Sequence, residues 1–190
     1  MTTSAAPTTA AIPSALNGTW TVDPTHSRIG FVARHAMVTK VRGSFADFTA
    51  TAELDFEDPS RSTATVEIAV ASIDTGQPQR DEHLRTNDFF DVPSFPTWTF
   101  TSTSVEVKGD DEFVLHGDLT IKGTTQPVSI DFEHTGTATD VYGNLRAGFE
   151  GRATISRKDF GVTWNAPLEA GGVLVSDKIV LELDVSAIKQ

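Results

Sequence analysis

Apolar and polar residues alternate along most of the chain. In FTATAELDF (48–56), every second residue from Phe48 to Phe56 is apolar, and the residues between them are threonines and acids. Successive side chains of a strand point to opposite faces, so a period of two indicates a strand with one buried face. Eight windows follow this pattern: 29–33, 48–56, 64–72, 98–109, 113–123, 128–136, 145–156 and 178–188.

Short turn sequences separate these windows. They include DPS at 58–60, GDD at 109–111, GTT at 123–125 before Pro127, YGN at 142–144 and GG at 171–172. The sequence therefore predicts an all-β domain of eight or nine antiparallel strands joined by short loops. Because open sheet edges invite aggregation, such a chain closes into a barrel or forms two packed sheets.

One segment, 77–87, predicts a short helix. Asp81 and Glu82 suit its first turn, Arg85 suits its last turn, and Asn87 can adopt the left-handed conformation that ends a helix. The prolines at 93 and 96 prevent a long continuation.

Composition narrows the classes of function. The formal net charge of −11 argues against a nucleic-acid backbone or an anionic membrane surface as a partner, because both would be repelled. The absence of cysteine excludes disulfides, thiolate metal sites and a cysteine nucleophile. No stretch approaches the 18 or so apolar residues of a membrane span, so we do not expect an integral membrane protein.

The start of the chain, MTTSAAPTTAAIPSALNG, is rich in threonine, alanine, serine and proline. It lacks lysine, arginine and an apolar run long enough for the core of a signal peptide. We therefore expect a disordered tail over 1–16, a single domain over 17–190, and a cytoplasmic location.

Four longer stretches resemble one known family. They are WTVDPTHSRIGFVARHAM with VRGSFADF (20–48), DTGQPQRDEHLRTNDFFDVPSFPTWTF (74–100), GDLTIKGTTQPVSIDF (117–132) and RAGFEGRATISRKDFGVTW (146–164). In this order and spacing they resemble the YceI-like, polyisoprenoid-binding proteins. The resemblance implies an extended eight-stranded antiparallel lipocalin-like barrel with a short helix near one opening. It also implies a binder or carrier of isoprenoid lipids, including polyprenyl quinones, and not an enzyme. Many members have a signal peptide and act in the periplasm, a pattern from which this chain departs.

The alternation selects candidate residues for an apolar lumen. We expect ligand contacts from Ile29, Phe31, Phe45, Phe48, Leu54, Val66, Ile68, Phe100, Leu119, Ile121, Ile130, Phe132, Phe149 and Ile155. Small residues on inward positions suggest space along the axis of the barrel: Ala33, Ala50, Ala52, Ala64, Ala147, Gly151 and Ala153. Around the mouth and a ligand head group we expect His26, His83, Leu84, Phe89, Phe90, Phe160 and Trp164.

The most charged segment, RDEHLRTNDFFD (80–91), is open to two interpretations. As a catalytic site, His83 would be a general base among nearby acids. As a structural plug, its charges would face water, Leu84, Phe89 and Phe90 would turn inward, and Arg80 and Arg85 would pair with local acids. The pattern favours the plug.

Other chemistry receives little support from the sequence. The five histidines (26, 35, 83, 116 and 134) lack the spacing of metal ligands, although His116 and His134 could approach across paired strands. Asp23, His26 and Ser27 are close in the chain, but Asp23 more naturally caps a turn. No metal or cofactor is expected besides the bound lipid, and a homodimer is compatible with an exposed edge or an aromatic mouth. Two alternatives stay open: a hydrolase or isomerase of an apolar substrate that uses His26 or His83, and a solid β-sandwich that acts through its surface.

Overall fold

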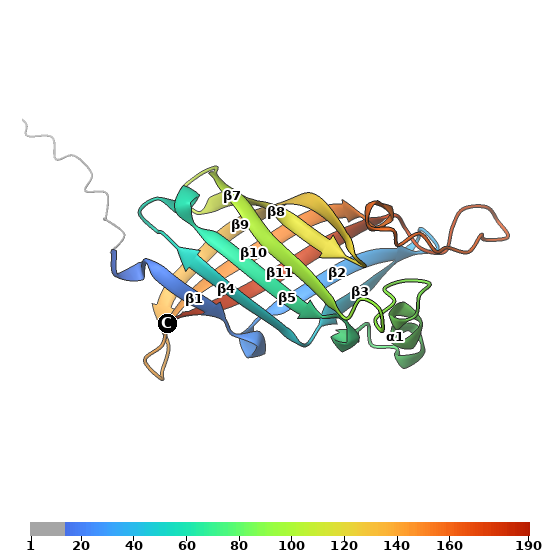
Figure 1. Cartoon of the computed structure of the whole chain (residues 1–190), viewed down its shortest axis with the longest axis horizontal. Coiled ribbons are helices and arrows are strands. Elements are labelled where there is room, and N and C mark those ends of the chain that lie inside the picture. Colours follow the sequence, from blue (N-terminus) through green and yellow to red (C-terminus); the bar gives the residue numbers. More distant parts are fainter. Residues whose placement is uncertain (1–13) are drawn as a thin grey trace, which may run out of the picture.

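The computed structural model describes residues 14–190, which form a closed antiparallel β-barrel (Figure 1). Its strands are β1 (Gly18–Val22), β2 (Arg28–His35), β3 (Thr39–Phe45), β4 (Phe48–Leu54), β5 (Thr63–Ala69), β6 (Ile73–Asp74), β7 (Thr97–Val107), β8 (Glu112–Ile121), β9 (Thr124–Thr139), β10 (Leu145–Ser156) and β11 (Lys178–Lys189). The helix α1 (Pro78–Arg85) lies at one end of the barrel. Five 3-10 turns complete the elements: η1 (Ser14–Leu16), η2 (Pro24–His26), η3 (Pro59–Arg61), η4 (Val70–Ser72) and η5 (Arg157–Phe160).

Eight strands close the ring, in the order β1-β4-β5-β7-β8-β9-β10-β11 and back to β1. β11 pairs with β1 near its end and with β2 over residues 180–184, so β2 extends the barrel wall beyond β1. β2 then pairs with β3, and β3 pairs with the two-residue β6. The turn η2 separates β1 from β2. Asp23 begins this turn by accepting a hydrogen bond from Thr25 N–H, and the chain changes direction there. The expected eight-stranded antiparallel barrel with a short helix is therefore confirmed, and the solid β-sandwich is excluded.

All eight sequence windows coincide with strands, and three strands were missed. β6 has only two residues, and β1 (GTWTV) was not assigned although its threonines alternate with Trp20 and Val22. In β3 a glycine stands at the inward position 43, so the apolar alternation is interrupted. The turn between β8 and β9 has two residues, Lys122 and Gly123, both with positive φ, as a tight hairpin requires.

The helix α1 is shorter than the predicted 77–87. Gln77 caps its start by accepting from the N–H groups of Gln79 and Arg80, and it ends where Thr86 donates to the carbonyl of His83. Asn87 does not have the left-handed conformation expected of it; Asp91, with φ of 48°, does.

The predicted tail, 1–16, lies outside the described residues except for its last three. These form η1, and the carbonyl of Leu16 accepts from Trp20 Nε1 at 3.0 Å. Residues 14–16 therefore contact the domain that the sequence analysis began at residue 17. Trp20 is fully buried and packs with Leu54, Phe56, Ala147 and Phe149 in a small core near β1 that borders the rest of the barrel interior.

Candidate functional site

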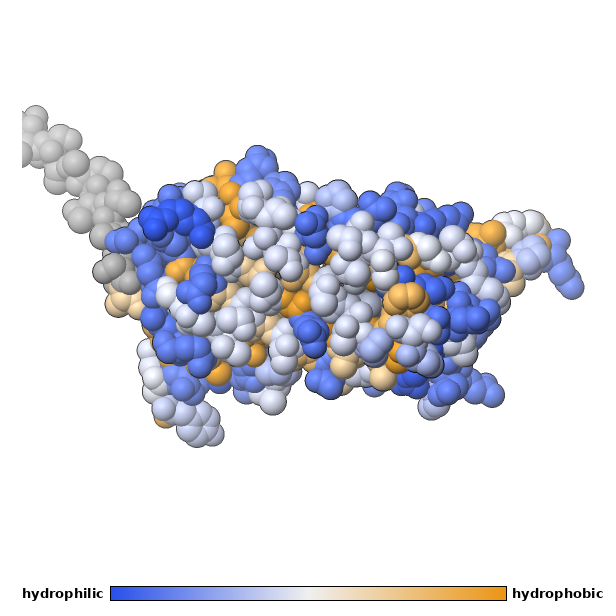
Figure 2. Space-filling view, in the orientation of Figure 1, coloured by the Kyte–Doolittle hydropathy of each residue, from blue (hydrophilic) through white to orange (hydrophobic). Residues whose placement is uncertain are grey.

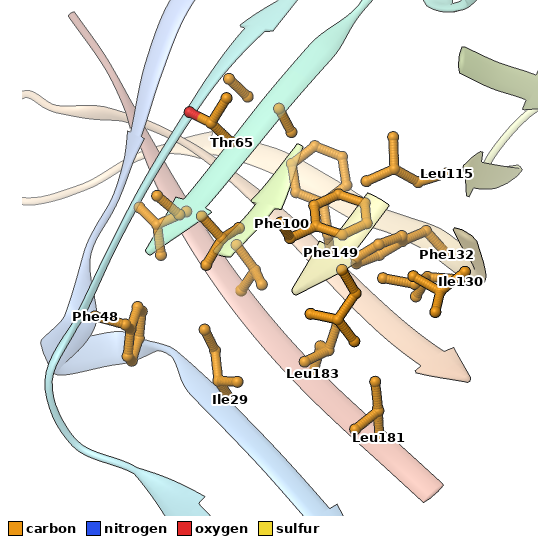
Figure 3. A pocket seen from close by; sticks show the side chains of 18 of the residues that line it. Ile29, Phe48, Thr65, Phe100, Leu115, Ile130, Phe132, Phe149, Leu181 and Leu183 are labelled. Atoms are coloured by element: carbon orange, nitrogen blue, oxygen red, sulfur yellow. The ribbon is translucent and has the colours of Figure 1, made fainter. Parts of the chain in front are cut away.

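A cavity of ≈ 720 Å³ occupies the rest of the barrel interior. All fourteen residues predicted for the lumen line it. Figure 3 shows several of them, including Ile29, Phe48 and Phe132, with their side chains directed into this space from different strands. A cavity of this size lies within the range of sites that enclose small molecules.

The strand β11 contributes a continuous apolar wall that the sequence analysis did not assign. Ile179, Leu181, Leu183, Val185 and Ala187 all line the cavity. They occupy every second position, so the alternation in the predicted strand 178–188 was sufficient to find them.

Glycines opposite phenylalanines allow aromatic rings to lie against the wall. The ring of Phe132 covers its cross-strand partner Gly151, where an added Cβ would be 2.4 Å from the ring. Phe31 covers Gly43 at the same distance. A ring held flat against the wall takes less of the bore than one that projects into it.

The small inward residues do not all provide space. Ala33, Ala50, Ala52 and Ala64 line the cavity, as expected. Ala147, Gly151 and Ala153 do not: Ala147 is in the core around Trp20, Gly151 lies under Phe132, and Ala153 packs in the main core. For these three the inference of free space was wrong, because neighbouring side chains fill the volume.

The end of the cavity near α1 is closed by aromatic packing. Leu84, Phe89, Phe90 and Phe160 line the cavity there, and Phe89 and Phe160 are buried. His83 and Trp164 do not line it; they contact one another edge to face, with ring centroids 4.9 Å apart, on its outer side. His83 also lies 2.8 Å from a carboxylate oxygen of Asp88 through Nε2. The contact between His83 and Trp164 joins α1 to the segment that follows η5.

Two expectations for the charged segment are corrected. Asp81 was placed on the face toward water, but it is 7% exposed and accepts hydrogen bonds from Thr75 N–H and Oγ1. Arg80 was expected to pair with an acid, but it donates to the hydroxyl and carbonyl of Thr75. These contacts anchor α1 to the chain before it, and Leu84, Phe89 and Phe90 face the cavity, as the plug interpretation expects.

Arg157 is a buried cation in the wall of the cavity that the predictions missed. Its guanidinium donates to the carbonyls of Ser176, Val162, Trp164 and Val175, the last at 3.4 Å. Burial lowers the pKa of Arg157, and the nearby charge of Asp177 opposes this effect. The hydrogen bonds hold the segment 162–176 against the barrel.

Trp98 carries the only buried side-chain polar atom without a hydrogen-bond partner in the part of the chain that the structure describes. Its ring lines the cavity between Phe45 and Phe90, with both centroid distances at 4.8 Å. Its indole N–H is itself enclosed by the surrounding side chains, so the ring, and not the N–H, faces the cavity.

At the opposite end the cavity reaches exposed, acidic turns. Asp110, Asp111 and Glu112 line it there and are exposed, and Asp55 and His134 line it nearby. The cavity is therefore closed by aromatic side chains near α1 and bordered by acids at its other end.

His26 does not lie at either end of the cavity wall. It is exposed, and its Nδ1 lies 2.7 Å from Asp23. Asp23 also accepts from Arg146, which pairs with Asp140 at 2.7 Å. Hydrogen bonds from Thr25 and Arg146 hold the pKa of Asp23 well below its ordinary value, and Arg146 does the same for the pKa of Asp140. This network fastens the turn η2 to the strand β10.

The remaining histidines form no joint site. His116 contacts Ser129 and Glu106, whereas His134 lies near Asp111 and Thr137, so the two do not approach each other as proposed. Across residues 14–190, no three metal-ligating side chains gather in an arrangement that could hold an ion. In the same residues no helix has the length and apolar character needed to cross a bilayer.

Known proteins share the fold and much of the sequence. BcnA of Burkholderia cenocepacia has a TM-score of 0.76 at 24% identity and covers 87% of this chain and 98% of its own. A polyisoprenoid binding domain from Saccharophagus degradans has a TM-score of 0.68 at 14% identity and covers 90% and 98%. The YCEI protein of Campylobacter jejuni has a TM-score of 0.72 at 30% identity and covers 83% and 90%.

Sequence comparison leads to the same group. Protein YceI of Salmonella newport is 40% identical over 138 residues, which are 73% of this chain and 72% of that protein. A UPF0312 protein of Pectobacterium atrosepticum is 41% identical over 138 residues, covering 73% and 71%. The family described as the YceI-like domain matches residues 20–187. The chain therefore belongs to the YceI-like family.

Proposed function

We propose that this protein binds one long-chain isoprenoid, or a related amphiphilic lipid, in the barrel and stores, transports or sequesters it. The single observation that carries the proposal is the continuous apolar bore. Its wall on β11 runs from Ile179 to Ala187, and at about 3.3 Å per residue this wall is roughly 26 Å long. The polyisoprenoid binding domain of S. degradans, which has the same fold, supports this choice of ligand.

The energetics of such a ligand are favourable. At about 0.8 kcal/mol per buried CH₂-sized group, each five-carbon unit contributes roughly 3–4 kcal/mol before costs. A few units offset the estimated 4–15 kcal/mol lost on association. The affinity would therefore come from the tail, and the head group would set its orientation.

A polyprenyl quinone is the ligand we favour within this class. Its long polyprenyl tail suits the apolar bore, and its head group is uncharged. The acids Asp110, Asp111 and Glu112 at the other end would repel a phosphorylated head group more than a neutral one.

A series of quinones that differ only in tail length tests the proposal. Binding would be followed by quenching of tryptophan fluorescence, since Trp98 lines the cavity. We expect affinity to increase with each added isoprene unit until the bore is full, and then to level off. An affinity that does not depend on tail length would contradict binding in the bore.

The alternative of an enzyme depends on His26 or His83, neither of which lines the cavity. Alanine at both positions should leave quinone affinity nearly unchanged if the protein is a binder, whereas an enzyme would lose turnover by orders of magnitude. The cytoplasmic location and the homodimer remain predictions, which cell fractionation and light scattering would test.

A further inference from the structure

The tip of the hairpin β2–β3 exposes apolar side chains at the same end of the barrel as α1 (Figure 1). Met37 is 53% exposed and Val38 is 75% exposed. The segment 166–174 lies beside this tip: the N–H of Ala36 donates to the carbonyl of Leu174 at 2.8 Å, and Val173 on that segment is 39% exposed. Two adjoining tips therefore present apolar side chains to solvent.

The backbone of the hairpin tip is strained. Ala36 and Met37 have φ values of 50° and 61°, a left-handed region that residues with a Cβ seldom adopt. Hairpin turns of this geometry are usually made by asparagine and glycine. Met37 and Val38 are exposed, so their side chains do not pack in the barrel. Backbone strain of this kind tends to occur where a segment has a function.

The same hairpin is the basic part of an acidic protein. Residues 28–46 contain Arg28, Arg34, Lys40 and Arg42 and no acid, although the whole chain carries −11. Arg34 is paired with Lys40 across the hairpin, and Arg42 follows on the same outer face because Ile29, Phe31 and Ala33 occupy the face toward the cavity.

These positive charges are not neutralised near the tip. Arg34, Lys40 and Arg42 are exposed and form no ion pair with any residue in 14–190. On the neighbouring strand β11, acids lie opposite the base of β2. In the strand register, Asp184 is opposite Arg28 and Glu182 is opposite Gly30. Closer to the tip β11 carries Val180 and the exposed Lys178. Three exposed acids lie around the patch: Glu169 on the adjoining segment, Asp74 of β6, which is paired with Ser44 of β3, and Glu82 of α1, which lies 3.5 Å from Arg85.

Figure 2 shows strongly hydrophilic and apolar residues together at this end of the molecule. At physiological ionic strength a charge acts over about 8 Å, so the acids at the far end of the barrel have little effect here. Basic side chains around exposed apolar ones form the surface by which peripheral proteins bind anionic lipid bilayers.

We propose that this end of the barrel docks on an anionic membrane surface, with Met37 and Val38 inserted between lipids and Arg34, Lys40 and Arg42 on the headgroups. The net charge of −11 keeps the rest of the protein, including the acidic end of the cavity, away from the bilayer. The inference goes beyond the proposed function, and it does not depend on which lipid fills the bore.

Flotation of the full-length protein with vesicles tests the proposal. We expect binding to vesicles of phosphatidylcholine with phosphatidylglycerol, weaker binding as salt is added, and little binding to phosphatidylcholine alone. The variant R34Q/K40Q/R42Q should reduce partitioning to the anionic vesicles on the order of 100-fold, from about fivefold for each basic residue. The variant M37S/V38S should reduce it roughly tenfold or more, since it removes the inserted apolar groups.

A matched control lies at the tip of the β9–β10 hairpin, where Val141 and Tyr142 are 92% and 87% exposed. The variant V141S/Y142S should bind vesicles as the unmodified protein does. The proposal is wrong if the unmodified protein does not bind anionic vesicles, if it binds neutral ones equally well, or if only V141S/Y142S loses binding. Quinone binding by all variants reports on the fold and on the cavity function separately, because none of the changed residues lines the bore.

Discussion

Blocking the bore tests whether the cavity is the binding site. Ala64 on β5 lines the cavity and faces Ala52 of β4 directly across the strand pair, so a larger side chain at position 64 has only small neighbours there. In the variant Ala64→Phe the ring projects into the space that a ligand tail would use. If the ring takes the place of one five-carbon unit, the lost contribution is about 3–4 kcal/mol. The dissociation constant should therefore rise roughly 100- to 1,000-fold.

The assay is quenching of tryptophan fluorescence by a long-tailed quinone. Thr101→Phe is the control, because Thr101 is on the neighbouring strand β7, is exposed, and does not line the cavity. It should bind as the unmodified protein does. Ala64→Phe should also keep its melting temperature, since the added ring enters open space and does not overpack a filled core. Unchanged affinity in Ala64→Phe, or an equal loss in Thr101→Phe, would refute binding in the bore.

Three further predictions concern the structure around the cavity. Gly151→Ala places a Cβ 2.4 Å from the ring of Phe132. Calorimetry should therefore show a stability loss of about 1–3 kcal/mol. An unchanged melting temperature would mean that the ring can move away from position 151. Arg157→Met leaves several backbone carbonyls without their hydrogen-bond donor. The free energy of unfolding, measured by chemical denaturation, should fall by at least about 2 kcal/mol. An unchanged value would show that other contacts hold the segment 162–176. The lowered pKa values of Asp23 and Asp140 mean that their contribution to stability is present above the ordinary value of 3.8 and is lost as the pH falls below it. Arg146→Met should therefore lose less stability than the unmodified protein between about pH 5 and pH 2. An equal fall in melting temperature for the two proteins over this range would contradict this.

The barrel could be predicted from the sequence because its signal is local. The strand 48–56 shows an uninterrupted period of two, and each inward position carries an apolar residue. The same rule failed for β3, where Gly43 replaces an apolar side chain because the ring of Phe31 fills that position from the neighbouring strand. Cross-strand compensation of this kind does not appear in the sequence of either strand alone.

The lining of the cavity was predictable, but its free volume was not. Alternation identifies which side chains face inward, and all the large residues chosen in this way do line the cavity. Whether a small inward residue leaves space depends on a partner far away in the chain: Ala64 faces Ala52 and leaves space, whereas Gly151 is covered by Phe132.

Charged residues gave the least reliable predictions. Asp81 was expected on a face toward water but accepts hydrogen bonds from Thr75, and no role was predicted for Arg157, which is buried. Asp81 is buried by a contact with the loop before α1, and Arg157 by contacts with the segment 162–176; local patterns of charge do not report such contacts.

The most direct test of the central claim is mass spectrometry of an organic extract from protein purified without detergent. The account predicts about one isoprenoid lipid for each chain, and little or none in Ala64→Phe. A lipid-free protein that also fails to take up an added polyprenyl quinone would contradict it.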